Sequence, residues 1–185
     1  MVSTARPYTS AKNWRGTLLG WAPLSVAIAG VLVAAFLVLR PSGAPSLVGR
    51  PAPNFTVTGV TGRRMTLRDL RGHPVVLNFW GVSCIYCRKE MPLLQAAYAE
   101  HRKDGLVVLG IDVQGDDVAA INTFTGERGV TYPQYLQGNT NWGALYNVSD
   151  LPESVFIDRS GTVRQFDPKP FLDAPSLAAA LRTIL

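Results

Sequence analysis

The feature that most constrains this chain is its only pair of cysteines, which stand three positions apart as Cys84-Ile85-Tyr86-Cys87 in a sequence of 185 residues. An apolar run, residues 75–80, leads into the pair, and a run with helical spacing follows it. The pair therefore falls where a predicted strand gives way to the N-terminus of a predicted helix. Unpaired amide groups and the helix dipole at such an N-terminus favour an ionised thiol.

The two cysteines are predicted to have different roles in thiol–disulfide exchange. If Cys84 is the first helical residue, its sulfur points at the unpaired amides, so we expect Cys84 to be the attacking nucleophile. Cys87 would lie one turn further along the same helix face, close enough to form a small disulfide ring with Cys84. Cys87 is therefore the predicted resolving thiol, which clears a mixed disulfide.

Two other interpretations of the pair are weaker. A purely structural disulfide across two residues closes a loop too small to add much stability. Half of a zinc site is the other alternative, but structural zinc takes four Cys or His ligands. The chain offers only His73 and His101 besides the cysteines, and both are expected at the surface. We predict no metal site.

The N-terminal part of the chain is predicted to be a membrane anchor. Residues 18–39 contain no charged side chain, and 22 residues at about 1.5 Å each match the roughly 30 Å hydrocarbon core of a bilayer. A cleavable signal peptide has a shorter apolar region, and the best small-residue site, 42–44, is followed by proline. We expect residues 1–17 in the cytoplasm and an uncleaved single-pass anchor over residues 18–39.

The flanking charges predict the orientation of this anchor. Three cations, Arg6, Lys12 and Arg15, precede the apolar run, whereas Arg40 directly follows it. The positive-inside rule therefore places the N-terminus in the cytoplasm and the rest of the chain outside it. An extracytoplasmic location suits a cysteine pair that cycles between thiol and disulfide.

The overall basic charge does not indicate a nucleic-acid-binding protein. Of the 18 Lys and Arg residues, four lie in the first 45 positions, where no Asp or Glu occurs. The remaining 14 are nearly balanced by 13 Asp and Glu. The excess charge thus belongs to the membrane flank, and no nucleic-acid partner is predicted.

The rest of the chain reads as a linker, residues 40–53, and one α/β domain, residues 54–185. The linker is rich in proline and small residues. Alternating strand and helix patterns in the domain predict a mixed central sheet with helices on both faces. The expected elements are a hairpin over 55–67, strands at 75–79 and 106–113, helices at 86–103, 117–128 and 142–146, a second hairpin over 154–166 and a helix at 175–184.

Four stretches in this order resemble one protein family. They are residues 48–80, the segment CIYCRKEMP, the strand 109–113, and YNVSDLPESVFIDRSGTV at residues 146–163. The second stretch matches the pattern Cys-x-x-Cys-[Arg/Lys]-x-Glu-x-Pro. The chain is similar to the thioredoxin superfamily and, more narrowly, to membrane-anchored extracytoplasmic proteins of the TlpA/ResA/CcmG type.

This resemblance implies a thioredoxin-like fold with an extra N-terminal β-hairpin, and it implies roles for individual residues. Cys84 and Cys87 would be the redox pair. Pro152 would follow a cis peptide bond that brings the Leu151 backbone beside the Cys84 sulfur, where it offers an edge to an extended substrate. Glu153 would tune the cysteine pKa by like-charge repulsion and relay protons.

The sequence departs from thioredoxin itself at two positions near the cysteines. Asn78 stands where thioredoxin has a buried aspartate, and Ser83 stands where it has a tryptophan. Because Asn78 cannot titrate, the proton acceptor must be elsewhere, with Glu153 and solvent as candidates.

The resemblance implies a membrane-tethered thiol–disulfide oxidoreductase, more specifically a protein-disulfide reductase in cytochrome c maturation with apocytochrome c as substrate. Electrons would come from a thiol carrier in the membrane, because no flavin or nucleotide motif is present. No cofactor is expected besides the Cys84–Cys87 disulfide itself.

Three alternatives remain open at this stage. One is a general disulfide oxidase or isomerase of the same fold. The second is a thiol peroxidase, although Gly81 stands where that family has a threonine. The third is a copper-binding assembly module, since cysteine sulfur suits Cu(I).

Overall fold

The structure is a computed structural model that describes residues 22–38 and 46–185. It divides into an N-terminal unit and a unit that begins at Ala44. The N-terminal unit contains helix α1 (Ala22–Val38), which lies within the predicted apolar span. Within residues 22–38 and 46–185, no helix combines the length and the apolar character needed to cross a bilayer. The predicted cytoplasmic segment, both ends of the predicted span and part of the linker lie outside the described residues.

The second unit is built on a five-stranded sheet in the order β5-β4-β3-β6-β7. Strands β3 (Val75–Trp80) and β4 (Val107–Asp112) run parallel at its centre, and β6 (Glu153–Ile157) pairs antiparallel with β3. The edges are β5 (Gln134–Tyr135), parallel to β4, and β7 (Val163–Asp167), antiparallel to β6. The predicted mixed sheet is confirmed.

The predicted N-terminal hairpin is also present, and it covers one edge of the sheet. Strands β1 (Thr56–Thr58) and β2 (Arg64–Thr66) pair antiparallel. The end of this hairpin hydrogen-bonds to the segment around β5, from Leu136 N to Thr58 O (2.9 Å) and from Val60 N to Gln134 O (3.1 Å). On the opposite edge, Gly49 N donates to Val163 O (2.8 Å) at the start of β7.

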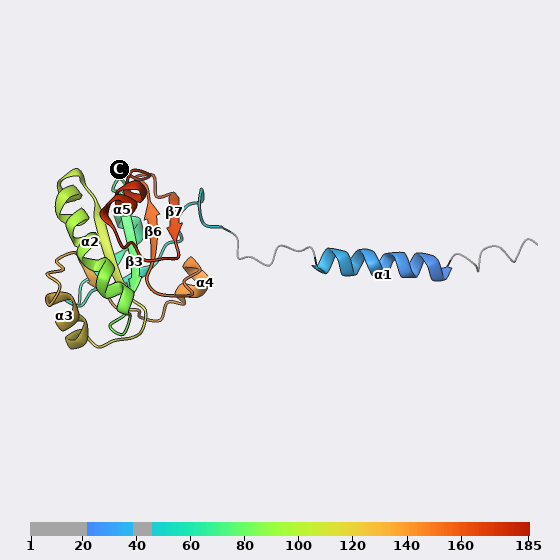
Figure 1. The fold of residues 1–185 in the computed structure, drawn as a ribbon, viewed down its shortest axis with the longest axis horizontal. Helices are drawn as coiled ribbons and strands as arrows, with labels where there is room; N and C mark the ends of the chain where they lie inside the picture. The colour runs from blue at the N-terminus through green and yellow to red at the C-terminus, as the bar shows by residue number, and fades with distance from the viewer. Residues whose placement is uncertain (1–21, 39–45) are drawn as a thin grey trace, which may run out of the picture. The chain divides into compact units, whose positions relative to one another are not determined.

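Helices lie on both faces of the sheet, unequally distributed (Figure 1). The helices α2 (Ile85–His101), α3 (Val118–Gly126) and α5 (Ala174–Leu181) pack on the face that carries the side chains of Val76 and Trp80. The short helix α4 (Trp142–Tyr146) packs on the other face, together with the hairpin and the 3₁₀ turn Leu67–Leu70. A second 3₁₀ turn, Arg102–Asp104, follows α2.

Successive side chains along the buried strands point to opposite faces of the sheet. They produce two cores, one on each face. In β3, Leu77 and Phe79 face α4, where Phe79 contacts the rings of Trp142 and Tyr146 at centroid distances of 5.3 and 5.8 Å. On the other face, Val76 packs with Leu94 of α2 and with α5. All six residues of β3 are buried, as expected of a central strand covered on both faces.

The boundaries of α2, α3 and α5 differ from the predicted ones by one position at the N-termini and by two or three positions at the C-termini. Side chains cap the N-termini. Asp117 and Asp173 precede α3 and α5 and accept hydrogen bonds from Ala120 N (2.7 Å) and Ser176 N (2.8 Å). The expectation that Cys84 is the first helical residue is wrong by one position, because Cys84 is the N-cap of α2. Helix α2 continues through Pro92 without interruption.

Candidate active site: a disulfide at the start of helix α2

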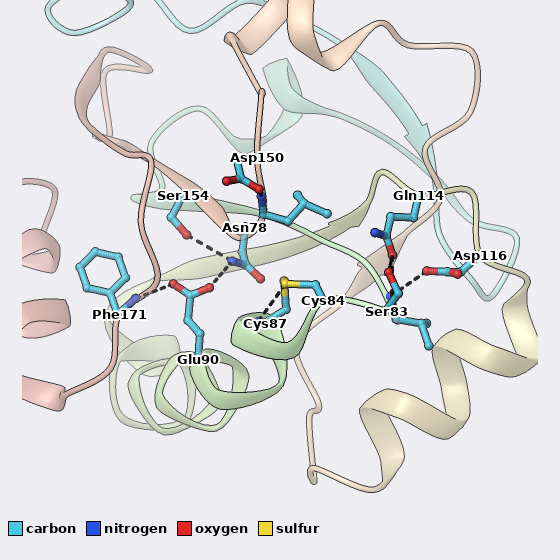
Figure 2. The surroundings of a disulfide bond; sticks show 12 residues. Asn78, Ser83, Cys84, Cys87, Glu90, Gln114, Asp116, Asp150, Ser154 and Phe171 are labelled. Carbon is cyan, nitrogen blue, oxygen red and sulfur yellow. Dashed lines mark hydrogen bonds between the residues drawn. A yellow bond between two sulfur atoms is a disulfide. The ribbon is translucent and has the colours of Figure 1, made fainter.

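Cys84 and Cys87 form a disulfide with an S–S distance of 2.04 Å at the point where β3 gives way to α2. As the N-cap, Cys84 has an extended backbone, and its Sγ accepts a hydrogen bond from Cys87 N at 3.0 Å. Figure 2 shows this bond at the mouth of the helix. An amide donor at this distance stabilises negative charge on the Cys84 sulfur when the disulfide is open.

The two sulfurs differ in exposure. Cys84 is partly exposed, whereas Cys87 is completely buried. Ile85 and Tyr86, between them, are 65% and 49% exposed, which is unusual for large apolar side chains. A partner molecule can therefore reach Cys84 but not Cys87, and the order of attack stays a prediction.

Cys87 lies in an aromatic and aliphatic cluster that fixes the start of α2. Its neighbours in this cluster include Trp80, Met91 and Phe124. The rings of Trp80 and Phe124 stack with centroids 5.0 Å apart and planes 27° from parallel. The cluster joins β3, α2 and α3 directly beneath the disulfide.

The loop before Cys84 is held by the segment that follows β4. Ser83 donates twice to Gln114 Oε1, from its amide (3.2 Å) and from its hydroxyl (2.8 Å), and Val82 N donates to Asp116 Oδ2 (2.8 Å). Gly81 makes this arrangement possible, because a Cβ there would lie only 2.2 Å from Gln114 Oε1. The peroxidase pattern would place a threonine at this position, where its side chain would displace Gln114 from Ser83.

Asp112, at the end of β4, organises the same segment. Its carboxylate accepts hydrogen bonds from the amides of Gln114 (3.2 Å), Gly115 (3.0 Å) and Asp116 (3.0 Å). Burial raises the pKa of Asp112 to about 6; the amide of Gln114 opposes this rise, and the neighbouring Asp116 carboxyl adds to it. The loop that supports Cys84 is thus tied to a buried carboxyl.

Pro152 and Leu151 lie where the resemblance implies. The Leu151–Pro152 peptide bond is cis. Leu151 and Cys84 both pack against the cluster around Trp80, so the segment before Pro152 borders the disulfide. The Leu151 amide is already occupied, because it donates to Asp150 Oδ1 at 2.8 Å. The predicted role of this segment in substrate binding stays a prediction.

Glu153 is buried, but its carboxylate is engaged within its own loop. It accepts hydrogen bonds from Ser149 N, Ser149 Oγ and Asp150 N at 3.1–3.3 Å. Because Glu153 and Ser154 are successive residues of β6, their side chains point to opposite faces of the sheet. The side chain of Ser154 points to the face that α2 covers, where it contacts Asn78. The expectation that Glu153 tunes the cysteine pKa stays a prediction.

Sequence reasoning missed a second buried carboxyl, Glu90, on the same helix as the cysteines. Its Oε2 accepts a hydrogen bond from Asn78 Nδ2 (3.0 Å), and its Oε1 accepts one from Phe171 N (3.1 Å). Asn78 Nδ2 also lies 3.2 Å from Ser154 Oγ. In the view of Figure 2, Asn78 and Glu90 lie between the disulfide and the residues Ser154 and Phe171.

Glu90 is the titratable group of this network. Its side chain is completely buried, and burial raises the pKa of Glu90 from 4.5 to about 7. The hydrogen bonds from Phe171 and Asn78 oppose this rise, while the negative charge of Asp167 adds to it. Because Glu90 follows Cys87 by three residues on the buried helix face, a carboxyl that titrates near neutral pH lies one turn from the resolving cysteine.

The histidines do not take part in this site. His73 Nδ1 lies 3.1 Å from Gly105 O, and His101 lies beside Glu100 and Asp104 at the end of α2. Among residues 22–38 and 46–185, no group of three or more His, Cys, Asp or Glu side chains is arranged to hold a metal ion.

A mixed sheet with a Cys-x-x-Cys disulfide at the start of a helix, bordered by a cis-proline segment, defines a thioredoxin-like protein. Within that class the chain belongs to the AhpC/TSA family, whose sequence model matches residues 48–166. The chain is 36% identical over 116 residues to the thiol-disulfide oxidoreductase ResA of Bacillus thuringiensis (strain Al Hakam). This match covers 63% of the chain and 66% of the relative, just under two thirds of its length.

Solved structures show the same relationship. A secreted disulfide oxidoreductase of Mycobacterium tuberculosis, homologous to DsbE, superimposes with a TM-score of 0.63 and 26% identity, covering 70% of this chain and 96% of that one. A DsbF homologue from Corynebacterium diphtheriae gives a TM-score of 0.65 and 25% identity, covering 73% and 87%. Both similarities extend over most of the second unit.

Proposed function

We propose that this chain is a thiol–disulfide oxidoreductase, tethered to the membrane with its domain outside the cytoplasm, that reduces protein disulfides in cytochrome c maturation. The observation that carries this proposal is the pair of sulfurs at the start of α2, where Cys84 is accessible and Cys87 is buried. The name of the ResA relative also supports the activity.

The reaction begins with the reduced pair. The Cys84 thiolate, stabilised by the Cys87 amide, attacks one sulfur of the substrate disulfide and forms a mixed disulfide, and the other substrate sulfur leaves as a thiolate. The Cys87 thiolate then attacks Cys84 Sγ and releases the second substrate thiol. Two electrons and two protons pass to the substrate, and the Cys84–Cys87 disulfide forms.

Glu90 supports this sequence as a proton acceptor. Cys87 must lose its proton before it can attack, and it is buried from solvent. A carboxyl with a pKa of about 7 on the same helix face can accept a proton at neutral pH and return it when the pair is reduced again. A membrane dithiol would then supply the two electrons and two protons that restore the starting state.

The membrane location rests on the sequence. Residues 18–39 are free of charge, and three cations precede them. We expect the full chain to remain in the membrane fraction after an alkaline wash, with its domain open to added protease from the outer side. Release of the chain by the wash would contradict the tether.

The substrate and the direction of transfer have a sharper test. In cells, a Cys87→Ala variant should accumulate as a mixed disulfide with apocytochrome c, and a Cys84→Ala variant should not. Capture of many unrelated secreted proteins would instead favour the general oxidase or isomerase. Equilibration with glutathione measures the reduction potential of the Cys84–Cys87 couple. A value of about −120 mV, as in strong oxidants, would exclude the reductase direction.

A further inference from the structure

The cis-proline segment forms one wall of a cleft of about 560 Å³. A volume of this size accommodates one or two amino-acid side chains of a bound peptide. The cleft lies between this segment, the end of β4 and the loop that leads into α4. Its polar lining residues are Gln137, Asn139, Thr140, Asn141, Ser149 and Asp150.

Asp150 is the only charged side chain among the residues that line this cleft. It is exposed, and no ion pair to it occurs in the described part of the chain. Arg88 and Lys89, the first cations after the cysteines in the sequence, do not line the cleft; they lie over the rings of Phe124 (5.0 Å) and Tyr86 (5.6 Å). The cleft therefore presents one uncompensated negative charge among uncharged hydrogen-bonding groups.

Asp150 also binds the backbone N–H of Leu151, which is the group that an extended substrate needs. Its Oδ1 accepts the hydrogen bond of the Leu151 amide at 2.8 Å, as Figure 2 shows above the disulfide. A peptide that pairs with the Leu151 backbone by strand addition needs this N–H as a donor. Such a peptide must first displace the Asp150 carboxylate.

We propose that this cleft is the subsite for a basic side chain that flanks the substrate disulfide. Asp150 is the ionic partner of that side chain, and Asp150 releases the Leu151 amide when the ion pair forms. This inference rests on the proposed function and names the substrate class of the same site. A lysine or arginine in the cleft draws the carboxylate away from the Leu151 N–H, which then binds the substrate backbone. A neutral peptide displaces the carboxylate without forming an ion pair in return, and an acidic peptide is repelled by the carboxylate.

The test uses the reduced full chain in detergent and three synthetic peptides with an intramolecular Cys-x-x-Cys disulfide. The peptides carry Lys, Gln or Glu on both sides of the motif and are otherwise identical. We expect kcat/KM to fall in the order Lys, Gln, Glu, with about a tenfold difference between the extremes at low salt, because exposed charge pairs contribute modestly. The difference should shrink at about 1 M salt, where the Debye length is roughly 3 Å.

Two substitutions separate the charge of Asp150 from its hydrogen bond. Asp150→Asn keeps an acceptor for the Leu151 amide and should reduce the Lys-to-Glu ratio to less than about twofold. Asp150→Ala also frees the amide and should raise kcat/KM for the Gln peptide about threefold over Asp150→Asn. The matched control is Asp69→Asn, an exposed aspartate outside the cleft lining, which should keep the wild-type ratio.

Reduction of hydroxyethyl disulfide, which is too small to reach the cleft, separates failure of this inference from failure of the proposed function. Wild-type protein that reduces it but treats the three peptides alike overturns the subsite. An Asp150→Asn variant with the wild-type ratio overturns it too. Wild-type protein that does not reduce hydroxyethyl disulfide overturns the proposed function, and this inference with it.

Discussion

Oε2 of Glu90 lies 3.0 Å from Nδ2 of Asn78, and both side chains are completely buried. The uncharged amide supplies a hydrogen bond but no compensating positive charge. Burial therefore dominates the titration of Glu90, and its pKa rises to about 7. The domain consequently holds in its interior a carboxyl whose pKa lies near neutral pH.

The stability of the domain should depend on pH through Glu90. Between about pH 4.5 and pH 7 the folded protein keeps a proton that the unfolded chain releases, so stability falls as pH rises through this window. A shift from 4.5 to about 7 corresponds to about 3 kcal/mol. Urea unfolding at several pH values should show this loss in the wild type and a smaller loss in Glu90→Gln, in which Asp112 still titrates.

Glu100→Gln is the control for this experiment, because Glu100 is an exposed carboxyl on the same helix. Asp112 also titrates in this window, but it is present in all three proteins, so the difference between them isolates Glu90. Identical pH slopes in the wild type and Glu90→Gln would show that Glu90 is ionised throughout.

Asn78→Asp should destabilise the protein at high pH far more than at low pH. This substitution places two carboxyl groups at hydrogen-bond distance, where they share one proton and resist losing it. We expect an additional loss of about 2–4 kcal/mol above pH 8, measured by urea unfolding, and much less at pH 5. Ser154→Ala removes another partner of Asn78 and should give a loss that does not change with pH.

Gly81 and Gln114 should behave as one unit. Gly81→Ala forces the Gln114 side chain away and breaks its two hydrogen bonds to Ser83, while Gln114→Ala removes the same bonds directly. Each change should cost about 1 kcal/mol. Because both act through the same contacts, the double variant should cost about as much as either single one, as a double-mutant cycle can measure. Additive losses would mean that Gly81 acts on something other than Gln114.

Alkylation should distinguish the two cysteines of the reduced protein. Cys84 is partly exposed and its sulfur lies 3.0 Å from an amide donor, whereas Cys87 is completely buried. We expect iodoacetamide to modify Cys84 at least about tenfold faster, as followed by peptide mass spectrometry. Equal rates would remove the basis for assigning Cys84 as the nucleophile.

The parts of the fold that depend on local patterns were predictable from the sequence. Continuous apolar runs identified β3 and β4, and helical spacing identified α2 and α5. Strand β5 was missed because two residues carry no periodicity, and its pairing with β4 depends on the tertiary structure. The predicted starts of α2 and α3, residues 86 and 117, each differ by one position from the observed starts at Ile85 and Val118.

The candidate site was predictable where its chemistry lies in the sequence and not where it depends on packing. The cysteines and Pro152 carry local patterns. Glu90 is the glutamate of the Cys-x-x-Cys-[Arg/Lys]-x-Glu-x-Pro pattern, but the pattern was not used to assign it a role. Its helical phase was a second signal, because Glu90 shares the buried helix face with Cys87 and Leu94. The contact between Asp150 and Leu151 depends on a loop conformation that no periodicity predicts.

The N-terminal extension closes the sheet at both sides, with the hairpin bound next to β5 and Gly49 bound to β7. Open strand edges are templates on which other chains add. By occupying these main-chain groups, the extension leaves fewer of them free to pair with the edge of another chain.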